Sequence, residues 1–309
     1  MHIIDLHCDT LYKAVTENIF LDSNQMEVSP YINKGIQCYA IWLPDEYSGE
    51  KAEQTFFKAA NLLKSECKRI GVKFVGNSDN LRKTFSENKF SACFTVENSL
   101  ALNNKIENVK NFADLGVRIM TLTWNGRNPV GDGAEVDNPT GITEFGKKVV
   151  TEMERYNIVV DVSHASDKLF YDVAEIARRP FIATHSNSRS VTSHKRNLTD
   201  EQFEIIKNNG GIVGLNFHNA FLSDEPDKAS KYDLLKHTEK FLSLGGENTI
   251  AIGSDFDGCS LSDDINGSIS MAEIYEMFLR YNYKESLIRK IFFENALKFF
   301  ENFDKERIM

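Results

Sequence analysis

Short apolar runs recur along the chain and alternate with longer amphipathic stretches. The apolar runs are typical of strands buried in a sheet, and the stretches between them carry apolar residues at helical spacing. Strands are predicted at Ile3–Asp9, Ile36–Leu43, Ser91–Glu97, Val117–Trp124, Ile158–His164, Phe181–His185, Ile212–Phe217 and Ile250–Asp255. Helices are predicted at Glu53–Ile70, Ile106–Leu115, Ile142–Tyr156 and Leu234–Leu244. Strands that alternate with helices indicate βαβ units and a parallel sheet.

Eight such units in 309 residues predict an α/β fold, a closed (β/α)8 TIM barrel. The alternative is a doubly wound open sheet, which usually carries a Gly-rich phosphate turn after its first strand. Here that position holds His-Cys-Asp-Thr. After the eighth strand, residues 271–304 predict a helical tail that packs on the barrel. Neither a repeat nor a linker divides the chain, so residues 1–309 are expected to form one barrel domain.

Composition narrows the class of protein further. The net charge of −9 and the absence of a basic stripe argue against a nucleic-acid partner and against binding to anionic lipid. No segment reaches the roughly 20 apolar residues of a membrane-spanning helix, and the first residues do not resemble a signal peptide. Five scattered cysteines are typical of reduced thiols, not of a disulfide framework. These features predict a cytoplasmic protein without a membrane partner.

Metal-capable side chains stand at the ends of most predicted strands. The ends read His7-Cys8-Asp9, Val96-Glu97, Asp161-Val162-Ser163-His164, Thr184-His185 and Ser254-Asp255-Phe256-Asp257. In a barrel these ends converge on one mouth, where active sites lie. Because side chains alternate along a strand, His7 and Asp9 are expected to share a face that excludes Cys8.

Imidazole and carboxylate groups are the ligands of hydrolytic zinc. His7 and Asp9 are predicted to hold one ion, His164 and His185 a second, and Glu97 to bridge them. Two such ions, roughly 3.5–4 Å apart, would share a hydroxide and polarise a carbonyl. Taken alone, each histidine could be a hydrogen-bonded structural residue, and each acid could be a solvated residue of a loop. Burying all five without an ion would be costly, which favours the metal site.

The same residues carry a resemblance to a known family. The segments are Asp5-Leu6-His7-Cys8-Asp9-Thr10, Thr95-Val96-Glu97-Asn98, Met120-Thr121-Leu122-Thr123-Trp124-Asn125, Asp161-Val162-Ser163-His164-Ala165-Ser166, Ala183-Thr184-His185-Ser186-Asn187, Lys195-Arg196-Asn197-Leu198 and Gly253-Ser254-Asp255-Phe256-Asp257-Gly258. In order and spacing, over essentially the whole chain, they resemble the membrane (renal) dipeptidase family of zinc peptidases and its soluble bacterial members.

The resemblance implies a role for each matching position. His7 and Asp9 correspond to ligands of a first zinc ion, His164 and His185 to ligands of a second, and Glu97 to the bridge. Asp255 corresponds to the acid that handles the proton of the bridging water, with Asp257 behind it. Arg196 corresponds to the residue that pairs with the free carboxylate of a dipeptide. The resemblance also implies a homodimer and acceptance of a D-residue at the C-terminal position.

One position departs from the family. Its animal members carry a histidine, thought to contact the substrate carbonyl, where this chain has Trp124. Asn125 is expected to supply the missing donor through its amide. The alternatives are that Trp124 only forms the pocket wall, or that His218 reaches across from beyond the seventh strand.

The predicted function is that of a zinc-dependent dipeptidase with two zinc ions. It would hydrolyse dipeptides with a free C-terminal carboxylate by a metal-bridging hydroxide. The first alternative is another binuclear hydrolase of the amidohydrolase type, such as a deacetylase, lactonase or deaminase. Binuclear members of that group often use His-x-His on the first strand and a carboxylated lysine on the fourth, whereas this chain has His7-x-Asp9 and Glu97. The second alternative is a non-catalytic ligand-binding barrel.

Overall fold

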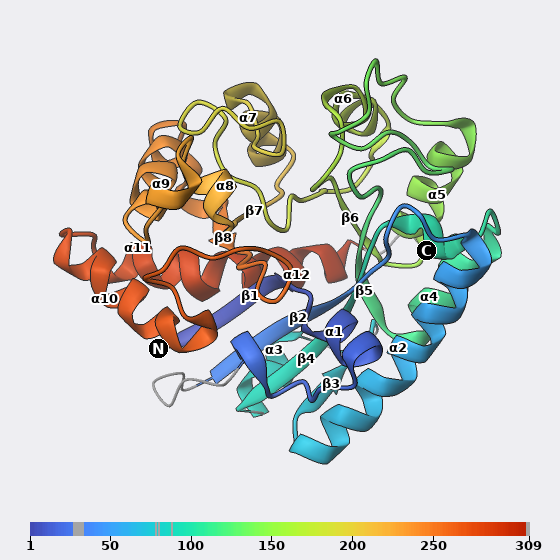
Figure 1. Ribbon diagram of the computed structural model, residues 1–309, viewed down its shortest axis with the longest axis horizontal. Helices are drawn as coiled ribbons and strands as arrows, with labels where there is room; N and C mark the ends of the chain where they lie inside the picture. Colours follow the sequence, from blue (N-terminus) through green and yellow to red (C-terminus); the bar gives the residue numbers. More distant parts are fainter. Residues whose placement is uncertain (27–33, 78, 80, 88, 307–309) are drawn as a thin grey trace.

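The computed structural model describes residues 1–26, 34–77, 79, 81–87 and 89–306. Parallel strands lie at the centre, and helices such as α2, α4, α5, α9 and α10 surround them (Figure 1). The strands are β1 (His2–Cys8), β2 (Lys34–Trp42), β3 (Lys73–Val75), β4 (Phe90–Glu97), β5 (Val117–Thr121), β6 (Val159–Asp161), β7 (Val213–Leu215) and β8 (Ile250–Ile252). Their hydrogen-bonded order is β6-β5-β4-β2-β1-β8-β7, with β3 beside β4.

Residues 181–185 close the ring between β6 and β7. Ile182 pairs with Asp161, the last residue of β6. The following residue, Ala183, pairs with Val213 of β7, and both pairings are parallel. These residues form isolated pairs where a full strand was predicted. The sheet therefore curls into the parallel α/β barrel that the sequence predicted. β3 was not predicted; it pairs only with the first half of β4, below the point where β5 begins.

Helices alternate with the strands, and capping residues fix where several of them begin and end. The α-helices are α1 (Thr10–Glu17), α2 (Gly49–Ile70), α3 (Leu81–Glu87), α4 (Glu107–Leu115), α5 (Glu144–Arg155), α6 (Asp167–Ile176), α7 (Asp200–Asn208), α8 (Asn219–Leu222), α9 (Asp233–Ser243), α10 (Met271–Arg280), α11 (Glu285–Arg289) and α12 (Asn295–Lys305). In α7, the Thr199 side chain accepts from the Gln202 backbone and the Gln202 side chain accepts from Thr199, a complete capping box. α2 ends at Gly71, whose φ of 71° suits glycine.

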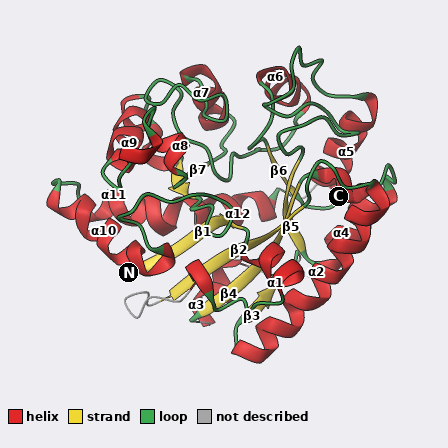
Figure 2. Ribbon diagram, in the orientation of Figure 1, coloured by secondary structure: helices red, strands yellow, loops and turns green. Residues whose placement is uncertain are grey.

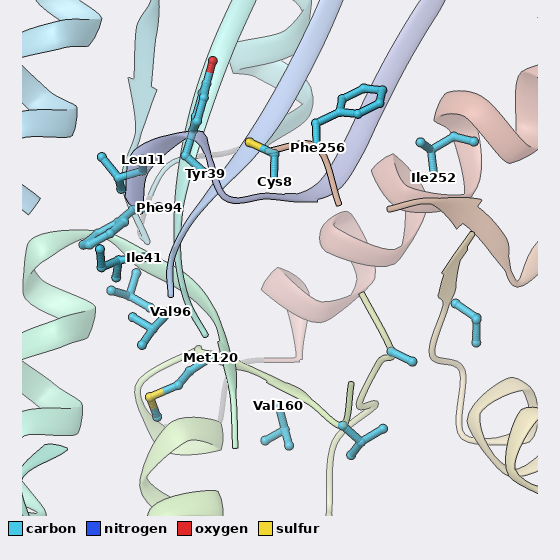
Figure 3. Packing of buried hydrophobic residues seen from close by; sticks show 14 of the residues in the cluster. Cys8, Leu11, Tyr39, Ile41, Phe94, Val96, Met120, Val160, Ile252 and Phe256 are labelled. Atoms are coloured by element: carbon cyan, nitrogen blue, oxygen red, sulfur yellow. The ribbon is translucent and has the colours of Figure 1, made fainter. Parts of the chain in front are cut away.

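One apolar layer packs between the strands and the surrounding helices. It includes Cys8, Tyr39, Phe94, Val96 and Phe256, which lie together in Figure 3. These side chains alternate along each strand with residues that face the barrel interior. The layer fixes which face of each strand turns outward, and so which side chains reach the mouth.

A second apolar layer fills the interior at the amino ends of the strands. Ile36, Ile119 and Ile182 pack there with Leu297 and Phe300 of α12. The predicted tail at 271–304 is thus helical, in three α-helices that begin at α10 and end with α12. Loop segments are prominent around α6 and α7 in Figure 2. Among the described residues, no helix combines the length and apolar character needed to cross a membrane.

Candidate active site

A row of strand-end residues crosses four neighbouring strands. Trp42 of β2 pairs in register with Glu97 of β4, Glu97 with Thr121 of β5, and Thr121 with Asp161 of β6. The register places polar side chains of different strands at one height, at the carboxyl mouth of the barrel. This is where the sequence predicted the site.

His7 reaches the interior because β1 carries a bulge. Asp5 pairs with Gln37 and Cys8 with Tyr39, so β1 has one more residue than β2 between the two pairs. A bulge of this kind turns a side chain that simple alternation would direct to the other face. Leu6 faces the interior and Cys8 packs in the outer layer, while His7 Nε2 lies 3.3 Å from Asp9 Oδ2.

Glycine at position 258 leaves room for the acids of this corner. A Cβ atom there would lie 1.9 Å from Asp9 Oδ2 and 2.7 Å from Asp255 Oδ1, so any larger residue would displace both carboxylates. His7, Asp9 and Asp255 form one cluster whose ligand atoms all lie within 4.8 Å of one another. Three buried groups with metal-ligating atoms therefore converge beside the bulge.

The two carboxylate oxygens of Glu97 face different partners. Oε2 lies 3.5 Å from His7 Nε2, whereas Oε1 lies 2.8 Å from His164 Nε2 and 3.7 Å from His185 Nε2. His7, Glu97 and His185 form the second convergent cluster. Glu97 thus stands between the His7–Asp9 pair and the His164–His185 pair, as a bridging ligand must.

The two histidines of the second pair are oriented by residues behind them. His164 has a φ of 67°, a left-handed conformation that is strained for a residue with a side chain, and its Nδ1 lies 2.6 Å from Asn125 Oδ1. His185 Nδ1 lies 2.7 Å from Thr184 Oγ1, which in turn donates to Asp161 Oδ2. With Nδ1 held in this way, Nε2 of each ring points to the centre, the usual arrangement behind a metal-binding histidine.

Burial sets the charges of the site. It lowers the pKa of His164 and of His185 well below the ordinary value, so both rings are neutral and their Nε2 lone pairs are available. Burial also raises the pKa of Asp9 to about 6, and the charge of Glu97 adds to this effect. Burial alone would lower the pKa of His7, but Asp9 and Glu97 raise it well above its usual range. Buried acids that resist ionisation in this way gain from a nearby cation.

The donor set fits metal ions. His164 Nε2 and His185 Nε2 lie only 3.0 Å apart, and Asp9 Oδ1 is buried with no hydrogen-bond partner among the described residues. Burying a carboxylate oxygen without a hydrogen-bond partner is unfavourable. Two neutral imidazole nitrogens that face each other with lone pairs and no proton between them are unfavourable for the same reason. A bound cation would give the Asp9 oxygen a partner and would accept the histidine lone pairs. The residues present therefore suit the metal that the sequence predicted.

Asp255 stands at the edge of the first cluster with one oxygen held from behind. Asn216 donates to its Oδ2 at 3.0 Å, and its Oδ1 lies 3.8 Å from His7 Nε2. Burial raises the pKa of Asp255 to about 7. Asp257 instead accepts from Thr10 Oγ1 at 2.6 Å and lies 3.4 Å from Lys13 Nζ, so it secures the start of α1.

Arg196 is a buried cation next to this site. Its exposed fraction is 4%, and its Nε and Nη2 atoms are buried without acceptors among the described residues. Burial lowers its pKa to about 10, and the charges of Asp255 and Glu97 oppose that shift. Two free donors on a desolvated guanidinium form a ready site for an anion such as a carboxylate.

A cavity of about 290 Å³ opens onto part of the candidate metal site, whereas Arg196 is not among the residues that line it. Asp9, Glu97, His164 and Asp255 line one part of it. The other lining residues are Tyr12, Lys13, Glu17, Trp42, Trp124, Asn125, His218, Phe221, Asp257 and Gly258. Trp124 is in the wall, one of the outcomes that the sequence left open. Asn125 also lines the cavity, but its oxygen is engaged with His164, a contact that the sequence did not predict. His218 begins α8, and its Nδ1 lies 3.1 Å from the Ser260 carbonyl oxygen.

Sequence reasoning missed several residues that shape the site. Asn216 directly follows β7 and Trp42 ends β2. The search of the strand ends was limited to metal-capable side chains; extended to other polar and to aromatic residues, it could have found both. Tyr12 lies on a helix that was not predicted, and nothing in its sequence context marks it. Asp161 was noted only as part of a motif; it orients His185 through Thr184.

Comparison with known proteins gives a consistent match over the whole chain. The model of the membrane dipeptidase family, peptidase family M19, matches residues 1–307. Dipeptidase 3 of Rattus norvegicus is 27% identical over 281 residues, which cover 88% of this chain and 57% of the rat protein. The alignment therefore leaves a large part of the rat protein unmatched.

Two crystal structures resemble this one closely. A metallopeptidase from Rhodobacter sphaeroides, liganded with a phosphinate mimic of the dipeptide L-Ala-D-Ala, has a TM-score of 0.88 and 25% identity, covering 97% of this chain and 99% of its own. The dipeptidase AC, a metallopeptidase of family M19, also has a TM-score of 0.88, with 26% identity over 97% of this chain and 98% of its own.

Proposed function

The chain belongs to the membrane dipeptidase family of metallopeptidases, and on that premise we propose that it hydrolyses dipeptides with a free C-terminal carboxylate at a site for two zinc ions. The observation that carries the proposal is the position of Glu97, whose two oxygens face separate groups of ligands. His7 and Asp9 would hold one ion and His164 and His185 the other. Three imidazoles with two carboxylates match the preference of zinc.

Arg196 is proposed to bind the terminal carboxylate. Its two free donors fit the two oxygens of that group, and burial strengthens the attraction because little water screens it. A longer peptide would place an uncharged amide there and leave the guanidinium without a counter-charge. The same contact therefore explains a preference for dipeptides.

Asp255 is proposed to move the proton. It would accept the proton of the attacking water at Oδ1 and deliver it to the leaving amine, while Asn216 holds Oδ2 in place. Burial raises the pKa of its carboxyl group, which favours the step in which it accepts the proton. The bound metal ions would supply an activated water and polarise the scissile carbonyl.

A D-residue at the C-terminal position is part of the proposal. Its support is the L-Ala-D-Ala mimic bound to the Rhodobacter sphaeroides protein, whose fold this chain shares. Asn125 remains a predicted donor to the carbonyl, although its oxygen faces His164. The homodimer and the cytoplasmic location also remain predictions.

The test is hydrolysis of L,L- and L,D-dipeptides by metal-free protein that has been reloaded with zinc. We expect activity to rise until two zinc ions are bound per chain and to vanish with chelator. Acetylated amino acids and lactones serve as controls for the amidohydrolase alternative. Turnover of a control with no turnover of any dipeptide would refute the proposal, and zinc binding without turnover of either class would favour a ligand-binding barrel.

A further inference from the structure

Both tryptophans of the chain line the cavity of the site. Trp42 ends β2 in register with Glu97, and Trp124 follows β5. Tyr12 of α1 completes the group: its ring centroid lies 4.7 Å from that of Trp42, which lies 4.9 Å from that of Trp124. We call these three residues the aromatic wall. It continues to His164, whose ring centroid is 6.2 Å from that of Trp124.

The residues of the aromatic wall meet one another through their rings and are half-buried. The indole N–H of Trp42 is buried and has no acceptor among the described residues, so no hydrogen bond of that group fixes the ring, which meets its two aromatic neighbours edge to face. Partly open aromatic faces beside a reaction centre gain free energy when a ligand covers them. The wall is therefore suited to hold a side chain of the substrate.

The charges around the wall exclude one class of side chain. Glu17 lines the same cavity, and its charge, like that of Glu46, acts on Tyr12. Among the described residues, Lys13 is the one lysine or arginine that lines the cavity, and its Nζ is 3.4 Å from Asp257 Oδ1. An anionic side chain would be repelled here, whereas an uncharged or cationic one would not.

The position of Arg196 decides which residue of a dipeptide meets the wall. Arg196 contacts Phe221, at 5.4 Å from its ring centroid, and Phe221 belongs to α8, which follows β7. Under the proposed function the C-terminal carboxylate lies there and the scissile bond lies at the ligands. The N-terminal residue then extends to α1, β2 and the end of β5, the elements that carry the aromatic wall.

We propose that Tyr12, Trp42 and Trp124 form the subsite for the N-terminal side chain and select a planar π group without negative charge. Two kinds of residue share this chemistry, the aromatic ones and arginine. Aromatic rings stack or meet edge to face with indoles, and a guanidinium lies flat over them. This inference rests on the proposed dipeptidase function and adds its substrate class.

The kinetic test compares pairs of Xaa-Ala substrates that differ in planarity. Phe-Ala is paired with cyclohexylalanyl-Ala, which has nearly the same shape without the π system, and Arg-Ala with Lys-Ala. We expect kcat/KM to be about 3- to 10-fold higher for the planar member of each pair, and Glu-Ala to be the poorest. If only the Arg pair differs, the selection is for the guanidinium; if only the Phe pair differs, it is for the aromatic ring.

Trp124→Leu should bring both ratios close to one. Phe221→Leu is the matched control, because Phe221 also lines the cavity but lies on α8, outside the aromatic wall. Any change that it causes through its contact with Arg196 should affect both members of a pair alike and leave the ratios as they are. Equal rates within both pairs in the unaltered protein, with dipeptides still hydrolysed, would overturn the inference and leave the dipeptidase function standing.

A binding test works even without turnover, because both tryptophans are in the wall. Zinc-loaded Trp42→Phe and Trp124→Phe proteins each keep one indole, and far-ultraviolet dichroism and zinc content would show that they are folded. We expect a reduced-bond analogue of Phe-Ala to change tryptophan emission in both, more than the cyclohexylalanyl analogue at equal saturation. No change with either analogue, at concentrations that inhibit the enzyme or saturate calorimetric binding, would refute the wall as the subsite.

Discussion

Replacing Arg196 by methionine tests how the site distinguishes a dipeptide from other amides. Nε and Nη2 are both buried and without acceptors among the described residues, so each can gain a full charge-assisted hydrogen bond from a carboxylate. Such a bond contributes about 1.5–3 kcal/mol, and two contribute roughly 3–6 kcal/mol. At about 1.4 kcal/mol for each factor of ten, Arg196→Met should lower kcat/KM for Ala-Ala by about 10²–10⁴-fold.

The same substitution should leave C-terminal amides nearly unaffected. Ala-Ala-amide offers a neutral acceptor, so the unaltered enzyme should already cleave it about 10²-fold less well than the acid. In Arg196→Met the two substrates should be cleaved at similar rates. The assay is kcat/KM for acid and amide with both proteins, at fixed zinc saturation.

The stability of the free enzyme gives an independent test, because Nε and Nη2 of Arg196 are buried there without an acceptor among the described residues. Removing a buried, unpaired cation should leave Tm unchanged or raise it. Arg189 is the matched control on the same loop: its guanidinium meets both oxygens of Asp167 and the carbonyl of Asn197. Arg189→Met should lower Tm and keep the acid–amide difference. Equal loss on acid and amide in Arg196→Met would refute carboxylate recognition.

Four further substitutions test the remaining roles. Glu97→Gln should lower the affinity of both metal positions together, measured by zinc titration; loss of a single ion would contradict a bridge. Asp255→Asn should keep the fold and most of the zinc but lower kcat by about 10²–10⁴-fold, and a rate within a few-fold of the unaltered enzyme would exclude it as the proton carrier. Asn125→Ala should weaken zinc binding by about 10–100-fold, because its oxygen orients His164; an unchanged affinity with a lower kcat would instead favour direct contact with the substrate. His237 is fully buried, accepts from the Ser188 amide and has a pKa lowered by burial to about 4, so its contribution to stability is complete above pH 6.5 and is lost, by about 3 kcal/mol, as the pH falls toward 4. Urea unfolding of His237→Gln should show a smaller loss over that range, and parallel curves for the two proteins would refute this.

The sequence was informative about the site where chemistry coincides with the ends of strands. Glu97 is the last residue of β4, as predicted. Its neighbour Val96 packs in the outer apolar layer, so the alternation of side chains along the strand directs Glu97 to the barrel interior. His164 was predicted to end a strand, but β6 stops at Asp161 and His164 lies in the following turn with a left-handed backbone. The prediction of its place at the mouth did not depend on that boundary.

Other features depend on contacts that no local pattern records. The bulge that turns His7 inward is a mismatch between β1 and β2, and neither strand shows it alone. The orphaned donors of Arg196 are a property of everything that surrounds it. The aromatic wall joins α1, β2 and the segment after β5, so its members are neighbours only in space.

The ligands and the aromatic wall are held in place in different ways, and this separates catalysis from selectivity. His7 depends on a bulge, and His164 on a strained backbone and on the amide of Asn125, so changes near them are expected to disturb the proposed metal site. The rings of Trp42 and Trp124 meet edge to face, and the side chain that orients His164 is that of Asn125, not of Trp124. A tryptophan at position 124, where the resemblance implies histidine in the animal members, therefore leaves the orienting partner of His164 in place. The substitution reshapes the wall that meets the substrate, so differences in side-chain preference within the family are expected to arise at positions such as this one.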